Sequence, residues 1–544
     1  MPGTREWVTT DLAVADRTIA GWGPREAHET VDVSGAALTA AFVDVHMHLE
    51  STKLWVDEFV RAVLPHGTTA VAADPHEIAN VFGIPGIVAL AEASGRLPFT
   101  FGISAPSCVP ASHFESPAAE FSSAELTELL EKHGAIGIAE FMDFPGVVNG
   151  DPEVLAKIAT AGNKRVDGHA PGVAGRQLDA YLAAGVESDH ECTDLKEAEE
   201  KRRKGMWIFI REGSASRNLA ALIGTVLRHG TDRIALCTDD REPDTLLHSG
   251  HVNDCARLAV AAGVSTEDAL VMVTSNPADY HRFDHLGWLA PGYQADVLCF
   301  DELSGFEPAR VWQAGKLVAA NGAVVPGAVP KVGAPDWMRA SVHLESPPGP
   351  DAFDCSPPPG GRARVIGIES RSLTTRGLVL DVTDPSVQVA RIAVVERHRR
   401  TGRIGLGYVQ GFGLTHGAIA STVAHDAHNC MVVGALDDSG PAEMAVAVAR
   451  LAEIGGGQLA VRDGQVLAEV RLPIGGLMSD QSIEEVAGEV RLLAEAASNG
   501  LGVTIDSPFM QLSFLGLSVL PELRITDKGL VDVMKFALTD VAAT

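Results

Sequence analysis

Cysteine and basic residues are both scarce in this chain. Its seven cysteines lie scattered among 544 residues without a CxxC pair, a pattern typical of reduced thiols in a cytosolic protein rather than of a disulfide framework. Lys and Arg number 43 against 71 Asp and Glu, which leaves a formal net charge of −28. Because sequence-independent binding to nucleic acid depends on neutralising phosphates, this balance predicts no nucleic-acid partner.

Long hydrophobic runs are also absent. No run approaches about 18 uninterrupted apolar residues, and the first residues show no positive segment followed by an apolar core. We therefore expect no membrane partner and a cytoplasmic location. The chain is 46% hydrophobic and long enough to fold into two or three domains.

What the chain does contain is a series of short apolar runs that end in metal-binding residue types. The first, residues 42–48, ends in His46 and His48. Residues two apart in a strand point the same way, so these imidazoles would project together and form half of a metal site. Taken alone, the pair fits polar residues of a loop equally well.

Further apolar runs follow in order and support the metal interpretation. Glu140, His169, His190 and Asp239 each stand at the end of one, and runs at 67–73, 99–103 and 207–211 complete a set of eight. Segments with helical spacing lie between them, at 123–133, 175–184 and 219–228 among others. Strands alternating with helices predict an α/β fold, a (β/α)8 TIM-type barrel whose chemistry lies at the carboxyl ends of its strands.

The polar residues at these strand ends exceed what one tetrahedral ion needs. We expect two divalent ions that share a carboxylate and a water or hydroxide, with Glu140 as the bridge. One ion would take His46, His48 and Asp239. The other would take His169 and His190. The alternative for any single residue is a hydrogen-bonded side chain at the barrel mouth.

The sequence closely resembles the bacterial adenine deaminase family of the amidohydrolase superfamily. The resemblance covers about Asp11 to Asp532 and is carried by FVDVHMHLEST, GTTAVAADPHEIANVFG, SCVPAS, AEFMDFPGVV, DGHAPGVAG, SDHECT, IREGSASRNL, CTDDREPD, TVAHDAHN, LPIGGLMSD and DSPFMQLSFLGL. Many superfamily members bridge their metals with a carboxylated lysine. Adenine deaminases resemble this chain in having a glutamate there, at Glu140.

The resemblance also implies a domain organisation. Residues 1–40 and 286–345 would form a small β-sandwich whose N-terminal part looks abridged, with strands near 11–22, 295–300 and 310–313. Residues 41–285 would form the catalytic barrel, and the Pro- and Gly-rich stretch 346–362 a linker without regular structure. Residues 363–544 would form a C-terminal α/β domain, with strands at 391–395 and 430–434 and helices at 441–454 and 483–497.

For function, the resemblance implies hydrolysis of adenine to hypoxanthine and ammonia. A metal-bridging hydroxide would attack C6, Asp239 would shuttle the proton, and His190 would serve catalysis as well as metal binding. Glu77 is the preferred second acid–base group, with Glu212 as the alternative. Manganese or ferrous iron is expected rather than zinc, and the resemblance implies a homodimer.

A third set of residues is expected to bind the purine base. Residues 422–429 either form a turn with local caps or fold over the barrel mouth and complete the pocket. The expected substrate-binding residues are Ser107, Cys108, Arg211, Glu212, Asp240, His425, Asp426 and His428.

Other functions stay open at this point. Glu242 and Asp254 stand where the family usually has histidine, which leaves room for a modified adenine or another aminopurine as substrate. A hydrolase of cyclic amides or N-acyl groups would use the same metals on a carbonyl. A non-catalytic metal-binding barrel would be expected to lack a ligand, and none is missing.

Overall fold

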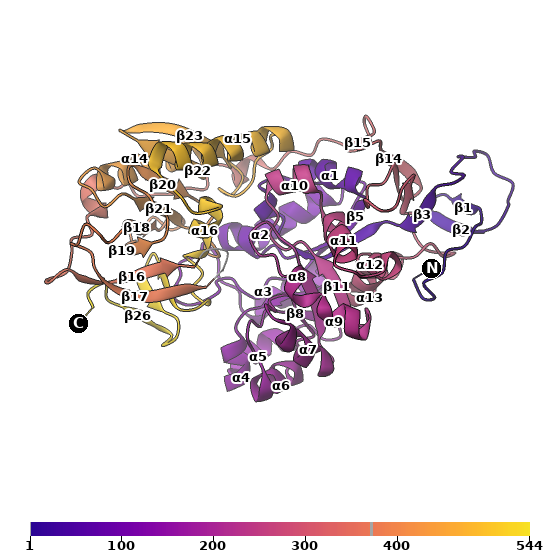
Figure 1. Ribbon diagram of the computed structural model, residues 1–544, viewed down its shortest axis with the longest axis horizontal. Helices are drawn as coiled ribbons and strands as arrows, with labels where there is room; N and C mark the ends of the chain where they lie inside the picture. The colour runs from indigo at the N-terminus through magenta and orange to yellow at the C-terminus, as the bar shows by residue number, and fades with distance from the viewer. Residues whose placement is uncertain (1, 370–373, 544) are drawn as a thin grey trace.

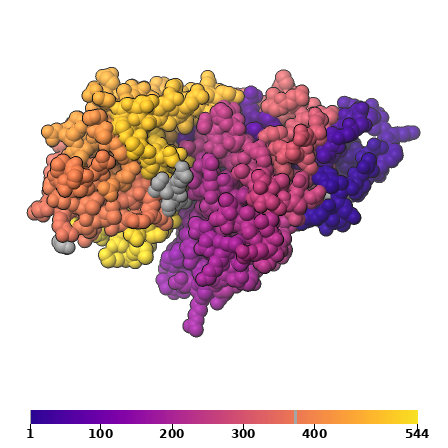
Figure 2. All heavy atoms as spheres, in the orientation of Figure 1, coloured from indigo at the N-terminus to yellow at the C-terminus, as the bar shows by residue number. Residues whose placement is uncertain are grey.

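The computed structural model describes residues 2–369 and 374–543. The C-terminal segment lies at one end of the molecule, the strands nearest the N-terminus lie at the other, and a set of parallel strands with their helices lies between them (Figure 1). Figure 2 shows the orange and yellow C-terminal residues packed directly against the magenta central part.

The central part, here called the parallel-strand unit, is built from eight strands in the described residues. Ladders join β4–β5–β6, β7–β8 and β9–β10–β11, all parallel. Hydrogen bonds also join the three groups, and the last strand to the first: Ala105 N to Gly137 O (2.8 Å), Glu187 N to Val166 O (3.0 Å) and Asp239 N to His46 O (3.1 Å). The strands are β4 (Phe42–Met47), β5 (Thr68–Ala73), β6 (Thr100–Ile103), β7 (Gly137–Phe141), β8 (Arg165–Gly168), β9 (Ser188–Asp189), β10 (Trp207–Arg211) and β11 (Ile234–Cys237).

Each predicted strand of this unit is present, because short β-branched runs that are buried on both faces favour parallel strands. The predicted helices at 123–133 and 175–184 are α3 and α6, but the one at 219–228 is broken into α8 and α9. Gly224 stands at the break, where an added Cβ would lie 3.0 Å from a Leu195 side-chain carbon. The helices are α1 (Val56–Val63), α2 (His76–Ser94), α3 (Ser123–Lys132), α4 (Phe144–Asn149), α5 (Pro152–Ala159), α6 (Gly175–Ala183), α7 (Leu195–Arg203), α8 (Leu219–Leu222), α9 (Gly224–His229), α10 (Pro243–Ser249), α11 (Val252–Ala261), α12 (Thr266–Met272) and α13 (Ser275–His281).

The flanking segments combine residues from both sides of the parallel-strand unit. One antiparallel sheet has the order β15–β14–β13–β12–β3, and a separate hairpin pairs β1 with β2. The strands predicted near 11–22, 295–300 and 310–313 are present within these elements. Their bounds are β1 (Leu12–Ala15), β2 (Thr18–Trp22), β3 (Ala37–Ala40), β12 (Val297–Phe300), β13 (Arg310–Gln313), β14 (Lys316–Ala320) and β15 (Ala323–Val324).

The C-terminal segment contains a mixed eight-stranded sheet of order β17–β16–β19–β18–β21–β20–β22–β23 and a three-stranded sheet β24–β25–β26. The strands predicted at 391–395 and 430–434 and the helices at 441–454 and 483–497 are β18, β21, α14 and α15. The bounds are β16 (Arg362–Ile368), β17 (Thr375–Asp381), β18 (Ala390–Val395), β19 (Ile404–Gln410), β20 (Ala418–Ser421), β21 (Cys430–Gly434), α14 (Gly440–Ile454), β22 (Gly457–Arg462), β23 (Gln465–Arg471), α15 (Ile483–Glu495), α16 (Pro508–Phe514), β24 (Leu523–Thr526), β25 (Gly529–Asp532) and β26 (Ala537–Thr539).

The proline-rich stretch before β16 differs from the expected linker in one respect. A short 3₁₀ helix, η4 (Pro350–Phe353), lies between its two proline clusters. Phe353 is fully buried and packs with Val432 and Leu451 of the C-terminal segment. An apolar ring flanked by prolines gains burial energy by docking, so this stretch lies against the segment it precedes.

Helix α2 positions part of the site. Its 19 residues are long and apolar enough to span a membrane by composition alone, but 67% of the window is buried inside the protein. The helix is interrupted at Gly83 (φ 64°) and contains Pro85. We interpret α2 as a core helix whose first residues, His76 and Glu77, enter the site described next.

Candidate metal centre

Glu140, at the end of β7, lies at the centre of a buried cluster of imidazoles and carboxylates. Its Oε1 is 3.4 Å from His48 Nε2, and its Oε2 is 3.2 Å from His190 Nε2. His169 Nδ1 lies 2.6 Å from the same Oε2. All four side chains are buried. Since each comes from a different strand, these distances show that the ends of four strands meet at the Glu140 carboxylate.

Asp239, which follows β11, completes the predicted set of ligands. Its Oδ1 is 3.1 Å from His46 Nε2 and 3.3 Å from His48 Nε2. The His46 ring stacks on that of His190 with 4.1 Å between ring centroids. The structure therefore brings all six predicted ligands into one cluster, since parallel neighbouring strands have their carboxyl ends at the same rim.

Three further ionisable residues join this cluster and were not predicted as ligands. His76 Nδ1 lies 3.3 Å from Asp74 Oδ2 and 3.5 Å from Glu140 Oε1. Glu191 Oε1 lies 3.5 Å from His190 Nε2. The sequence carried a signal for each, because Asp74 and His76 stand two apart after β5 and Glu191 directly follows a predicted ligand.

The distances in the cluster fit bound metal ions better than hydrogen bonds. Charge-assisted hydrogen bonds span about 2.7–2.9 Å between heavy atoms. Ligand atoms about 2.1 Å from a tetrahedral ion lie about 3.4 Å apart, close to most of the separations above. Two pairs, His169 Nδ1 with Glu140 Oε2 at 2.6 Å and His46 Nε2 with Asp239 Oδ1 at 3.1 Å, are within hydrogen-bond distance. Asp74 Oδ2 is buried with no hydrogen-bond partner in the structure, which leaves it available as a ligand.

The residue types in the cluster also fit a binding site for divalent metal. Histidine and carboxylate together suit divalent transition ions, and groups of three or four such side chains have ligand atoms within 4.8 Å of one another. These groups include His48, Asp74, His76 and Glu140; His46, His48 and Asp239; His46, Glu140 and His190; His169, His190 and Glu191; and His76, Glu77 and His425. The cluster can thus bind divalent metal.

Opposed electrostatic effects act on the two predicted acidic ligands. Burial by itself would raise the pKa of Glu140, but the charges of His169 and His190 and their hydrogen bonds hold that pKa well below its usual range. Burial likewise opposes ionisation of Asp239, and the Arg211 guanidinium together with His46 outweighs it, so the pKa of Asp239 is also lowered. Both carboxylates are ionised and negatively charged at neutral pH, as metal ligands must be.

Ser107 and Cys108 form hydrogen bonds with the backbone at the end of β7. The Ser107 hydroxyl donates to the Glu140 carbonyl at 2.7 Å, and the Cys108 thiol donates to the same oxygen at 3.4 Å. Burial raises the pKa of Cys108 to about 12, so it is a neutral thiol. In the structure these two residues position Glu140.

Arg211 and Glu212 point in opposite directions, as neighbours at a strand end do. Arg211 donates to Asp239 Oδ2 at 2.7 Å and pairs with Glu191. Glu212 accepts from the backbone N–H of Leu219 at 3.2 Å, at the start of α8. The structure thus places Glu212 outside the cluster, because a carboxylate is stabilised by the unpaired N–H groups of a helix N-terminus.

The remaining predicted residues lie where the C-terminal segment meets the cluster. Asp240 accepts a hydrogen bond from Ser51. His425 Nδ1 lies 3.8 Å from Glu77 Oε1, and His428 Nε2 lies 3.5 Å from Glu77 Oε2. Asp426 Oδ1 lies 3.5 Å from His76 Nε2. The loop at 422–429 therefore reaches the first turn of α2, and its expected role in completing the pocket stays a prediction.

Glu242 and Asp254, which stand where the family usually has histidine, each form an ion pair with a neighbouring basic side chain. Lys53 Nζ donates to Glu242 Oε1 at 2.7 Å, and the side chain of Lys53 is buried. Arg241, also buried, donates to Asp254 Oδ2 at 3.1 Å. Each acid thus stabilises a neighbouring cation.

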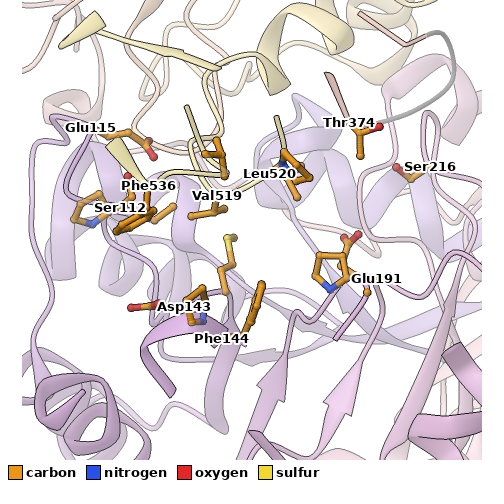
Figure 3. A pocket seen from close by; sticks show the side chains of 18 of the residues that line it. Ser112, Glu115, Asp143, Phe144, Glu191, Ser216, Thr374, Val519, Leu520 and Phe536 are labelled. Atoms are coloured by element: carbon orange, nitrogen blue, oxygen red, sulfur yellow. The ribbon is translucent and has the colours of Figure 1, made fainter. Parts of the chain in front are cut away.

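A cavity of about 2170 Å³ leads from the surface to Glu191 and Arg211. Figure 3 shows Val519, Leu520 and Phe536 of the C-terminal segment facing Phe144 of α4 across the cavity, and Glu191 also lines it. Leu520 packs in turn with Met142 and Phe514 in an apolar cluster. A flat apolar ligand could enter between the two segments and reach the polar cluster at the inner end.

Comparison with known protein families shows the class of protein to which the chain belongs. Residues 37–318 match the Amidohydrolase family, whose members typically use divalent metal, and residues 369–537 match the Adenine deaminase C-terminal domain. The fold and the buried histidine–carboxylate cluster are those of a metal-dependent hydrolase of this class.

Close relatives narrow the assignment. The chain is 44% identical to adenine deaminase 2 of Carboxydothermus hydrogenoformans, over 99% of this chain and 95% of that protein. It is 43% identical to the adenine deaminase of Desulfatibacillum aliphaticivorans, over 97% and 92% of the two chains. A solved β-aspartyl dipeptidase from Fervidobacterium islandicum matches with a TM-score of 0.46 and 15% identity, over 59% of this chain and 95% of that one. The chain belongs to the adenine deaminase family.

Proposed function

We propose that the chain hydrolyses adenine to hypoxanthine and ammonia, breaking the C6–N bond and forming a C6–O bond with water. Near-complete alignment with the relatives supports this reaction. The observation in the structure that carries it is Glu140, a glutamate that lies among His48, His169 and His190 at the strand ends. Purine salvage is the metabolic role that this reaction would serve.

We propose that two divalent ions, manganese or ferrous iron, occupy the cluster. His46, His48 and Asp239 would hold one and His169 and His190 the other, with Glu140 shared. Such ions supply Lewis-acid activation of water, whose pKa they lower toward neutrality. The absence of cysteine from the cluster supports these metals over zinc, which often takes soft ligands.

Asp239 is the proposed proton carrier. Its Oδ2 accepts from Arg211, which lines the cavity, and its Oδ1 faces His46 and His48, so the carboxylate is held in a fixed orientation. It would take the proton of the attacking water at Oδ1 and pass it to the departing amine nitrogen. His190 lies 4.0 Å from Asp239 Oδ1 and would help orient it.

Glu77 is the proposed source of the second proton, for the purine ring nitrogen, and it would be reprotonated by the proton that the new C6–O–H group loses as the C6=O bond forms. Burial raises its pKa, which favours the protonated acid that such a role needs. Glu212, the alternative from sequence, caps a helix and is directed away.

The surroundings of the base would come from both segments. Ser107, Cys108 and Arg211 surround Glu140 and Asp239, and the apolar residues from α16 and after it close the cavity from above. A largely desolvated site strengthens every electrostatic interaction with the purine. The substrate-binding role expected for Asp240, His425, Asp426 and His428 stays our proposal. These residues lie beside Ser51, Glu77 and His76 and are not among the residues that line the cavity described above.

The domain organisation expected from sequence stays our proposal: a (β/α)8 barrel over 41–285, a β-sandwich from 1–40 and 286–345, a linker at 346–362 and a C-terminal domain over 363–544. The hydrogen bonds that join β11 to β4 support closure of the barrel. The family matches at 37–318 and 369–537 support the division into a catalytic and a C-terminal part.

The test is a direct assay. Manganese-loaded protein is incubated with adenine, with another aminopurine and with a cyclic amide. Ammonia, hypoxanthine and the ring-opened acid of the cyclic amide are measured. We expect equal amounts of ammonia and hypoxanthine from adenine, and no ring-opened acid from the cyclic amide. Turnover of the cyclic amide alone would refute the proposal, and faster turnover of the other aminopurine would reassign the substrate.

A further inference from the structure

We propose that a third divalent cation binds between the barrel and the C-terminal domain, held by His76, Glu77, His425 and Asp426. The site lies beyond the two-ion centre proposed above and does not depend on which substrate the enzyme uses. Two ligands come from the first turn of α2 and two from the loop between β20 and β21. The ion would therefore link the two domains directly.

The ligand atoms are close enough to share one ion. His76 Nε2 lies 3.5 Å from Asp426 Oδ1, and His425 Nδ1 lies 3.7 Å from that same oxygen. Glu77 Oε1 lies 3.8 Å from His425 Nδ1. These separations are too long for charge-assisted hydrogen bonds and near the edge lengths of a coordination shell with bonds of about 2.1 Å.

Unpaired buried atoms give the second, independent observation. His76 Nε2 is buried and has no hydrogen-bond partner in the structure, and the same is true of Glu77 Oε2 and Asp426 Oδ2, the second oxygens of the two carboxylates. His76, Glu77 and Asp426 are 3%, 0% and 1% exposed. Buried polar atoms that lack partners are costly, and a cation coordinated by them removes that cost.

The two nitrogens of His76 separate this site from the barrel centre. Nδ1 faces Asp74 and Glu140, whereas Nε2 faces Asp426. Ring nitrogens of one imidazole point in divergent directions, so an ion on Nε2 cannot be an ion bound at Glu140. His76 would thus stand between the two-ion centre and the third ion.

Charge and support also favour a cation here. Two neutral imidazoles and two carboxylates give a donor set of charge −2, which balances a divalent ion. With the ion bound, Glu77 is an ionised ligand and does not carry the proton proposed above for the ring nitrogen, so the two roles of Glu77 exclude each other. The His425 ring stacks on Phe514 at 4.7 Å and 10° between planes. Glu115, from the barrel, accepts the backbone N–H of Ala427 at 3.1 Å. Contacts of this kind orient metal ligands in advance.

The first experiment counts metal ions. Protein loaded with Mn²⁺ and freed of excess metal by gel filtration is analysed by inductively coupled plasma mass spectrometry. We expect three manganese ions per wild-type chain and two in Asp426→Asn and in His425→Gln. Asp438→Asn and His248→Gln, which change exposed residues of the same types, should keep three. Two ions per chain in wild-type protein would overturn the proposal.

The second experiment avoids the variants, in case they fail to fold. Wild-type crystals grown with Mn²⁺ are measured at the manganese absorption edge. An anomalous peak between His76 Nε2 and His425 Nδ1 supports the site. Peaks at Glu140 alone would show that His76 and His425 are protonated and paired with the carboxylates instead. Adenine turnover, measured on the same sample, tests the deaminase function separately.

Discussion

Replacing Lys201 by methionine tests how His169 and His190, the ligands proposed for the second ion, are held. Lys201, on α7, is fully buried, and its Nζ donates to Asp189 Oδ2 at 3.0 Å and to the Ala170 carbonyl at 2.6 Å. Asp189 directly precedes His190, and Ala170 directly follows His169. The lysine therefore ties together the ends of β8 and β9.

The size of the effect follows from burial. Burial would raise the pKa of Asp189, but the Lys201 charge holds it well below its usual range. Removing one partner of a buried ion pair costs about 3–5 kcal/mol because the other charge is left uncompensated. For a cooperative unit of about 280 residues, with an unfolding entropy of about 2.1 cal/mol/K per residue, this lowers Tm by about 5–8 °C.

Differential scanning calorimetry of metal-loaded protein at pH 7.5 and a fixed scan rate measures the shift. The matched control is Lys204→Met, at the end of the same helix. Lys204 pairs with Asp179 at 2.7 Å and Glu200 at 3.1 Å on a partly exposed surface. Such pairs contribute about 0–1 kcal/mol, so its Tm should change by less than about 2 °C. A Lys201→Met protein within 2 °C of wild type would refute the reasoning.

Three other substitutions test the site and its support. Glu140→Gln removes one ligand charge, so metal content and ammonia release should fall together; full metal content with full activity contradicts the shared-ligand role. Asp239→Asn should keep at least one ion but lower kcat by about 100-fold or more, because the proton carrier is lost; wild-type kcat would exclude that role. Burial, followed by the charge of Asp426, raises the pKa of Glu115 to about 8. Its contribution to stability is therefore complete below its unfolded pKa of about 4.3 and is lost as pH rises through about 8. The fall in Tm between pH 6 and pH 9 should be smaller in Glu115→Gln than in wild type, and equal falls would contradict this.

Local pattern determined much of this protein. The apolar β-branched runs specify the eight parallel strands, because residues of this kind are stable only when buried on both faces. The polar residue that ends each run then had to lie at the common rim. His46, His48, Glu140, His169, His190 and Asp239 converge for that reason, and their chemistry could be inferred before any tertiary contact was known.

Tertiary structure decided the parts that depend on distance between remote segments. Sequence could not distinguish whether Glu212 or Arg211 faced the cluster, because both stand at a strand end and only the partners Glu191 and Leu219 settle it. The residues of the C-terminal loop were recognised, but their neighbours were not. His425 and Asp426 meet His76 and Glu77 only because the loop between β20 and β21 reaches the first turn of α2. Their separation of some 350 residues along the chain leaves no periodic signal, and packing of the two apolar surfaces alone fixes which charges meet.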